Sequence, residues 1–155
     1  MPDLLVRLYD LPEPPPAASG VTIRRAIPPE RHAVTGWIMR TFSVAPWVSE
    51  CETAMSSLPV TTWLAVEDSG NEMLGFACHD ATAKGFFGPT AVAEAARGRG
   101  IGVALLFATL HGMREAGYAY AIIGGVGPVE FYARHLDVLV IPGSDPGIYR
   151  GMLGG

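Results

Sequence analysis

Three glycines alternate with larger residues immediately before a long apolar run. They lie in the stretch Arg97 to Gly102, which reads RGRGIG and leads into a predicted helix from Gly100 to about Ala116. Glycine costs about 1 kcal/mol relative to alanine in a helix, so three near its start weaken it unless the missing side chains serve another purpose. One such purpose is the close approach of a phosphate to the free N–H groups of a helix start. The spacing therefore indicates a phosphate-binding loop.

Two common phosphate-binding motifs do not fit this loop. A dinucleotide fingerprint that starts at Gly98 needs a glycine at position 103, where this chain has Val103. The nucleotide-binding P-loop needs Gly-Lys-Ser/Thr, which is absent from residues 97–106 and from residues 124–132. The loop is therefore not expected to bind NAD or to hydrolyse a nucleotide.

Alternating and helical patterns predict the elements that position the loop. A strand over residues 85–94 precedes it, Gly117 ends the helix, and a buried strand over residues 118–126 follows. Upstream we expect a strand (20–27), two helices (28–43 and 45–57) and a hairpin (59–68 with 72–80). Downstream we expect a short helix (128–135) and two strands (137–143 and 147–153). This order predicts an α/β or α+β fold with a right-handed crossover between parallel strands.

The chain divides into two unequal parts. Residues 1–20 combine an apolar arm, DLLVRLYDL, with a proline-rich linker, and residues 21–155 form the main domain. A length of 155 residues with 49% hydrophobic residues suffices for one domain with a substantial core. The arm carries Leu4, Val6 and Leu8 on one face, so we expect it to pair with a sheet edge of its own subunit or of a neighbour in a homodimer.

The loop and its surroundings resemble the GNAT N-acetyltransferase superfamily. Residues 97–102 fill the pattern Arg/Gln-x-x-Gly-x-Gly/Ala, which is similar to the pyrophosphate-binding signature of that family. The resemblance extends over residues 21–153 and ends in a short helix that carries EFYAR, where family members resemble LYEKLGF. It implies a mixed central sheet with splayed parallel strands, flanked by helices. It also implies acetyl-CoA as co-substrate and an amine of a small molecule or peptide as acceptor.

The resemblance also implies roles for individual residues. The backbone N–H groups from Arg99 to Gly102 would bind the pyrophosphate, and a backbone N–H near Val92 would polarise the thioester carbonyl. Tyr132 matches the family's tyrosine and would give a proton to the leaving thiolate. The expected coenzyme contacts are Ala91, Val92, Ala93, Arg97, Gly98, Arg99, Gly100, Ile101 and Gly102.

Two questions stay open at this level. The general base is unassigned among Glu94, His79 and Asp80. The segment GGVGPVEFYARHLD departs from the family pattern, with Gly125 where asparagine is common and Pro128 where alanine is common. A catalytically inactive acyl-CoA-binding or sensing module is therefore the alternative function.

Composition narrows the partners and the compartment. A net charge of −4 argues against nucleic acid, because phosphate binding needs a basic surface. His32, His111 and His135 lack metal-ligand spacing, and Trp37, Trp47 and Trp63 are expected in the core. The sequence contains no run of about 18 apolar residues, so no membrane span is predicted. Cys51 and Cys78 have no CxxC spacing, and no secretory leader is recognised, which favours a reduced cytoplasmic setting.

Overall fold

The computed structural model describes residues 1–16 and 18–154 and contains one mixed sheet in the order β2-β3-β4-β5-β6-β1-β7. Its strands are β1 (Leu4–Arg7), β2 (Val21–Arg25), β3 (Thr62–Glu67), β4 (Met73–His79), β5 (Phe86–Val92), β6 (Tyr120–Ile123) and β7 (Val138–Val140). Its helices are α1 (Arg31–Phe42), α2 (Ala45–Met55), α3 (Ile101–Glu115) and α4 (Val129–His135). Four 3-10 turns are η1 (Leu8–Asp10), η2 (Pro28–Glu30), η3 (Glu94–Ala96) and η4 (Gly147–Tyr149).

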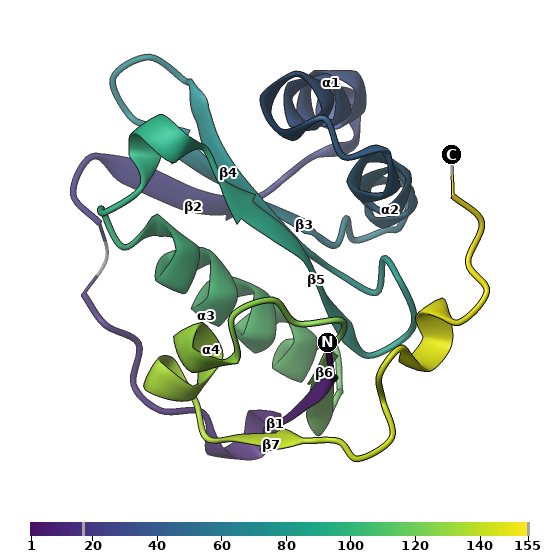
Figure 1. Cartoon of the computed structure of the whole chain (residues 1–155). Helices are drawn as coiled ribbons and strands as arrows, with labels where there is room; N and C mark the ends of the chain where they lie inside the picture. The colour runs from purple at the N-terminus through teal and green to yellow at the C-terminus, as the bar shows by residue number, and fades with distance from the viewer. Residues whose placement is uncertain (17, 155) are drawn as a thin grey trace.

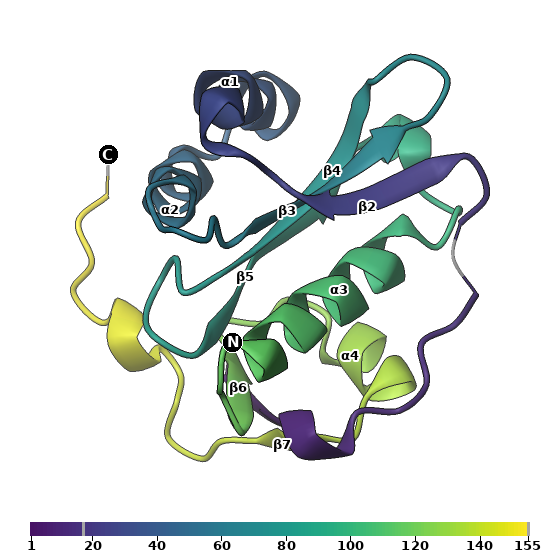
Figure 2. The same ribbon diagram turned by 180° about the vertical axis from the view of Figure 1, so that it is seen from behind.

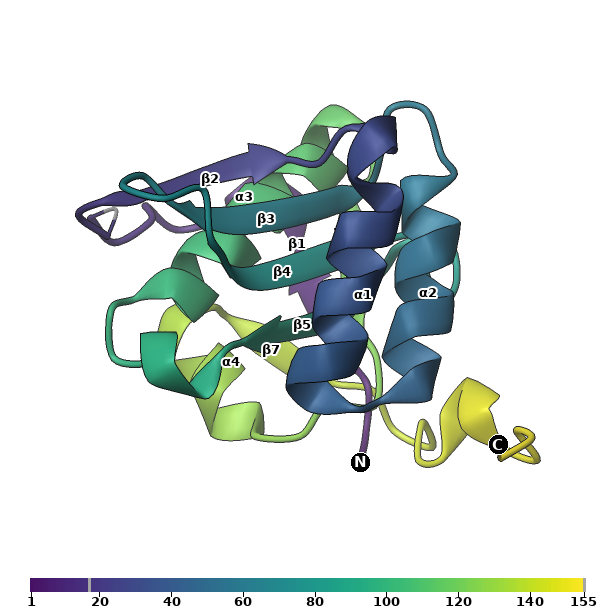
Figure 3. The ribbon, with the colours of Figure 1, turned by 90° about the horizontal axis from the view of Figure 1, so that it is seen from above.

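Helices cover both faces of the sheet (Figure 1). Helices α1 and α2 lie side by side across β3 and β4 (Figure 3), where Ile38, Cys51 and Phe76 are fully buried. Helices α3 and α4 lie on the opposite face (Figure 2), where Leu105 and Leu110 of α3 are fully buried. The expected α/β fold with helices on both faces is confirmed.

The parallel strands β5 and β6 diverge soon after they begin. Only Phe86 and Phe87 of β5 pair with β6, opposite Ile122 and Ile123, whereas β5 runs on to Val92 alongside β4. The second half of β5 therefore has an unpaired edge where β6 has turned away. This confirms the predicted splay of the parallel strands.

The N-terminal arm completes the sheet of its own chain. Strand β1 lies between β6 and β7 and pairs antiparallel with both. Leu4, Val6 and Leu8 are buried in the core below α3. The apolar face of the arm thus finds its partners within one chain, and the homodimer stays a prediction.

The C-terminal segment corrects one expected element. The strand predicted over residues 147–153 is wrong, because residues 147–149 form the turn η4 and Gly147 and Gly151 have φ of 62° and 72°. Such positive φ values are incompatible with an extended strand.

The predicted end of α3 is confirmed, because Gly117 follows the helix with φ of 103°. Among the described residues, none of the helices is both long and apolar enough to span a bilayer.

Candidate functional site

A pocket of about 470 Å³ lies between the unpaired half of β5, the start of α3 and helix α4. It is lined mainly by backbone and apolar side chains: Phe87, Thr90, Ala91, Val92, Ala96, Arg97, Gly98, Gly100, Ile101, Gly102, Val103, Leu106, Pro128, Phe131 and Tyr132. The sequence predicted ten site residues, and eight of them line this one pocket. The other two, Ala93 and Arg99, lie next to it in sequence but do not line it.

The glycine loop has the geometry of a backbone anion site. Gly98 and Gly100 have φ of 85° and 74°, a conformation that other residues rarely adopt. A Cβ added at either position would meet no atom within 4 Å, so the space beside the backbone is open. Helix α3 begins at Ile101 with no side-chain cap, and its first N–H groups have no acceptor within the helix. These donors lie at the positive end of the helix dipole.

The edge of β5 offers further backbone donors to the pocket. The N–H of Ala93 donates to the carbonyl of Leu74 in β4 over 2.8 Å. Successive residues of a strand direct their N–H groups to opposite sides, so those of Val92 and Thr90 point away from β4. That side faces the gap left by β6, which pairs with β5 only at Phe86 and Phe87. An extended ligand can therefore pair with β5 as an added strand.

Tyr132 lies at the wall of the pocket and is buried. Its side chain is 8% exposed, and its ring packs edge-to-face against Phe87 and Phe131 at centroid distances of 6.3 and 5.1 Å. Burial raises the pKa of the Tyr132 hydroxyl to about 12. The phenol is therefore protonated at neutral pH and can donate a hydrogen bond.

Arg99 directs its side chain away from the pocket. Its guanidinium donates to the two carboxylate oxygens of Glu67 over 2.8 and 3.4 Å and to the carbonyl of Ser19 over 3.2 Å. The side chain therefore binds the end of β3 and the segment before β2. Only the backbone of Arg99 remains available to a ligand in the pocket.

None of the three candidate bases lines the pocket. The Nδ1 of His79 is 2.7 Å from one oxygen of the Asp80 carboxylate, and the other oxygen accepts from the Tyr118 hydroxyl and the Gly85 N–H. His79 is 2% exposed, and its burial lowers the pKa of the imidazole. Glu94 lies exposed in η3. The general base stays unassigned.

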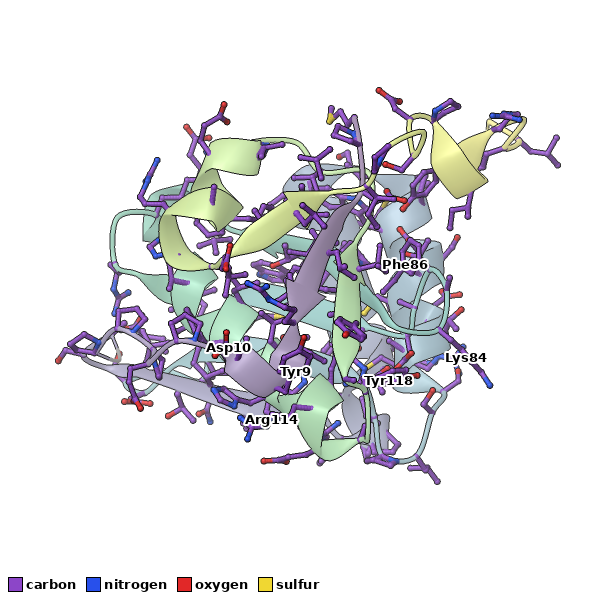
Figure 4. The ribbon with its side chains drawn as sticks, turned by 90° about the horizontal axis from the view of Figure 1, so that it is seen from below. Tyr9, Asp10, Lys84, Phe86, Arg114 and Tyr118 are labelled. Atoms are coloured by element: carbon purple, nitrogen blue, oxygen red, sulfur yellow. The ribbon has the colours of Figure 1, made fainter. Side chains whose placement is uncertain are left out.

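The opposite face of the sheet carries an aromatic and acidic group of residues at the point where β5 and β6 separate. A Cβ on Gly124 would lie 2.8 Å from the Phe86 ring and 3.0 Å from the Tyr149 hydroxyl, so both rings pack directly on the backbone after β6. Figure 4 shows Phe86 on the side of β6 away from β1. Burial raises the pKa of Tyr149, as do the negative charges of Glu50 and Asp3.

A second and larger pocket of about 520 Å³ lies between α1 and the strands β2, β3 and β4. Its charged residues include Arg24 and Glu30, which pair with each other over 2.6 Å. It contains none of the predicted site residues. Within the described part of the chain, no three His, Cys, Asp or Glu residues lie together as metal ligands.

Sequence reasoning missed several apolar residues of the site. Phe87 and Phe131 line the pocket beside predicted residues. The sequence pointed to them only through their positions, Phe87 in the strand β5 and Phe131 next to Tyr132. Tyr149 was assigned to a strand that does not form, and nothing in its sequence context indicated its packing on Gly124. Trp37 and Trp47 pack against the core on the α1 side, and Trp63 packs on the α3 side, as predicted.

Known structures share this fold. A GNAT enzyme from Sphaerobacter thermophilus matches over 90% of this chain with a TM-score of 0.73 and 24% identity. A glucosamine N-acetyltransferase region of a fungal multi-domain β-N-acetylglucosaminidase matches over 90% of this chain with a TM-score of 0.71 and 16% identity. The matches span only 48% and 20% of those two chains. A GNAT acetyltransferase from Brucella melitensis, in complex with acetyl-CoA, matches over 78% of this chain and 88% of its own, with a TM-score of 0.57 and 21% identity.

A comparison of the sequence with family models shows the family of this chain. No curated protein matches this chain. The family model "Acetyltransferase (GNAT) family" matches residues 31–136, which is more than half of the chain and includes the glycine loop and Tyr132. This protein therefore belongs to the GNAT acetyltransferase family.

Proposed function

We propose that this protein is an N-acetyltransferase that moves the acetyl group of acetyl-CoA to an amine by direct attack. The observation that carries the proposal is the single pocket that joins the glycine loop, the unpaired edge of β5 and Tyr132. Acetyl-CoA carries a pyrophosphate, then an extended arm with amides, then the thioester sulfur. The loop suits the pyrophosphate, the β5 edge suits the amides, and Tyr132 suits the leaving thiolate. The Brucella melitensis relative was crystallised with acetyl-CoA, which supports the assignment of the ligand.

The open space beside Gly98 and Gly100 fits a phosphate close to the backbone, where N–H groups of the loop and the α3 start donate to its oxygens. The edge of β5 pairs with the amides of the pantetheine arm. The outward N–H of Val92 or Thr90 donates to the thioester carbonyl, and such a donor contributes a few kcal/mol only if it meets the developing oxyanion.

The transfer itself is a simple exchange of bonds. The lone pair of an uncharged amine forms the new C–N bond at the thioester carbon, and the C–S bond breaks with its electron pair leaving on sulfur. Tyr132 donates a hydrogen bond to this sulfur. The proton of the attacking nitrogen leaves to solvent or to a base that is not yet assigned.

The acceptor approaches, in this proposal, from the face that carries Phe86 and Tyr149. Phe86 packs on Gly124 where β5 and β6 separate, and the next residue, Phe87, lines the coenzyme pocket. The nearby carboxylates of Glu50 and Asp3 form no ion pair with Lys or Arg among the described residues, and both raise the pKa of Tyr149. Aromatic rings and carboxylates both attract cations, so an amine that carries a second, positively charged group is the favoured acceptor class.

A coenzyme-binding module without catalysis is the second candidate. It is favoured by the high pKa of Tyr132, which makes this phenol a weak acid, and by the absence of the three candidate bases from the pocket lining. Both candidates require the same coenzyme site. They differ only in whether the thiol is released.

Acetyl-CoA is expected to raise the thermal unfolding midpoint, whereas NAD and ATP are not. At 100 times its dissociation constant, a ligand that binds only the folded state stabilises it by about 2.7 kcal/mol. For a chain of this length that corresponds to a shift of very roughly 5–10 °C. Differential scanning fluorimetry measures it. An equal shift with NAD, or none with acetyl-CoA, would contradict the proposed ligand.

A further inference from the structure

The coenzyme loop has few contacts to hold its shape. Side chains at positions 98 and 100 are absent, and even an added Cβ there would touch nothing within 4 Å. Residues 97–100 are all exposed. A loop with two glycines at positive φ and no packing samples many conformations unless another contact restricts it.

Arg99 supplies such a contact from the middle of the loop. Its Nη1 donates to the Oε2 of Glu67 over 2.8 Å, and its Nη2 lies 3.4 Å from Oε1 of the same carboxylate. The same Nη2 donates to the carbonyl of Ser19 over 3.2 Å. A two-pronged guanidinium–carboxylate pair fixes direction as well as distance.

The partner of Arg99 is itself held in the sheet. Glu67 is the last residue of β3, lies opposite Val21 of β2, and its N–H donates to the carbonyl of Glu72 over 2.8 Å. Hydrogen bonding to Arg99 lowers the pKa of the Glu67 carboxyl, and the same contact raises the pKa of Arg99. The pair is therefore ionised at neutral pH and connects the loop to a rigid strand end.

We propose that Arg99 is a positioning residue, which Glu67 and Ser19 hold so that the backbone N–H groups of residues 98–102 are preorganised for the coenzyme pyrophosphate. The inference rests on the proposed use of acetyl-CoA. A basic side chain in a phosphate loop would be expected to contact the phosphate, but that of Arg99 binds Glu67 and Ser19, which do not line the pocket. Its charge acts on the ligand through the loop conformation rather than by contact.

Losing the Arg99–Glu67 pair weakens acetyl-CoA binding by lowering the fraction of molecules whose loop is in the binding conformation. The apparent dissociation constant rises as that fraction falls. A partly exposed ion pair with good two-pronged geometry contributes at the upper end of the range for surface pairs. We expect its loss to weaken acetyl-CoA binding about 3- to 10-fold.

The test compares Glu67→Gln with Glu30→Gln. Glu30 forms a similar two-pronged pair with Arg24, at 2.9 and 2.6 Å, but touches no part of the loop. Titration calorimetry with acetyl-CoA should show weaker binding for Glu67→Gln and for Arg99→Gln, no further loss in the double variant, and no change for Glu30→Gln. In steady-state assays the KM for acetyl-CoA should rise with kcat unchanged.

Each result has a defined meaning. Unchanged binding in Glu67→Gln, or equal losses in Glu67→Gln and Glu30→Gln, would overturn the positioning role. Tighter binding in Glu67→Gln would also overturn it, because Arg99 would then be a phosphate ligand that Glu67 restrains. Wild-type protein that fails to bind acetyl-CoA would overturn the proposed function instead.

Discussion

Replacing Tyr132 with phenylalanine is expected to lower the rate of acetyl transfer about 10- to 100-fold, with acetyl-CoA affinity nearly unchanged. The ring would keep its edge-to-face contacts with Phe87 and Phe131, so only the hydroxyl is lost. A hydrogen bond to a charged group contributes about 1.5–3 kcal/mol, and here the charge develops on the departing sulfur.

The raised pKa of Tyr132 sets the form of this contribution. With a pKa of about 12, the phenol would give its proton to a thiolate of pKa about 8.5 only at a cost of about 5 kcal/mol. Hydrogen bonding to the sulfur, followed by protonation from solvent, is therefore favoured over complete transfer. Because the pKa is raised, Tyr132 stays protonated as the pH increases, and its ionisation should cause no loss of activity between about pH 6 and pH 10.

Turnover, acetyl-CoA affinity and the pH profile measured on the same Tyr132→Phe protein separate the possibilities. Unchanged turnover would show that Tyr132 only packs in the core. Lost affinity would make it a coenzyme contact. An alkaline decrease below pH 10 that disappears in the variant would show that the phenol ionises in the catalytic range.

Replacing Gly100 with valine is expected to weaken acetyl-CoA binding by about 100-fold or more. The substitution forces a branched side chain onto a residue with φ of 74° and fills the open space beside the loop. A phosphate kept away from the backbone loses several charge-assisted hydrogen bonds, each contributing about 1.5–3 kcal/mol.

Gly117→Val is the matched control for backbone strain. Gly117 also has a positive φ, of 103°, and open space around its Cβ, but it ends α3 at the end away from the pocket. Both variants should lose stability through strain, measured by urea unfolding. Only Gly100→Val should lose acetyl-CoA binding, measured by calorimetry, and equal affinities of the two variants would show that the loop has been misassigned.

The sequence was most informative where one backbone requirement dictates residue type. The turn before α3 needs positive φ at Gly98 and Gly100, so the glycines of residues 97–102 indicated a loop there, while its binding of a phosphate stays a prediction. The same is true of Gly117, because a helix that ends in a left-handed residue favours glycine. Strands with a regular alternation, such as β2 and β3, were likewise predictable.

Contacts between distant segments were not predictable in the same way. The turn that brings Tyr149 onto Gly124 depends on positive φ at Gly147, which a pattern of apolar residues does not reveal. The pairing of β1 with both β6 and β7 depends on which edges the sheet leaves open. The attachment of Arg99 to Glu67 spans 32 positions of sequence, and nothing local distinguishes this arginine from Arg97.

Release of free thiol from acetyl-CoA, followed with a thiol reagent across a panel of amines, distinguishes an acetyltransferase from a coenzyme-binding module. The panel should pair diamines with monoamines of equal length that end in a neutral group, because Glu50 and Asp3 favour an acceptor with a second, positively charged group. We expect amine-dependent thiol release, faster for the diamine of each pair. Wild-type protein that binds acetyl-CoA yet releases no thiol with any amine would contradict the proposed transfer, and faster release with the monoamines would contradict the acceptor class alone.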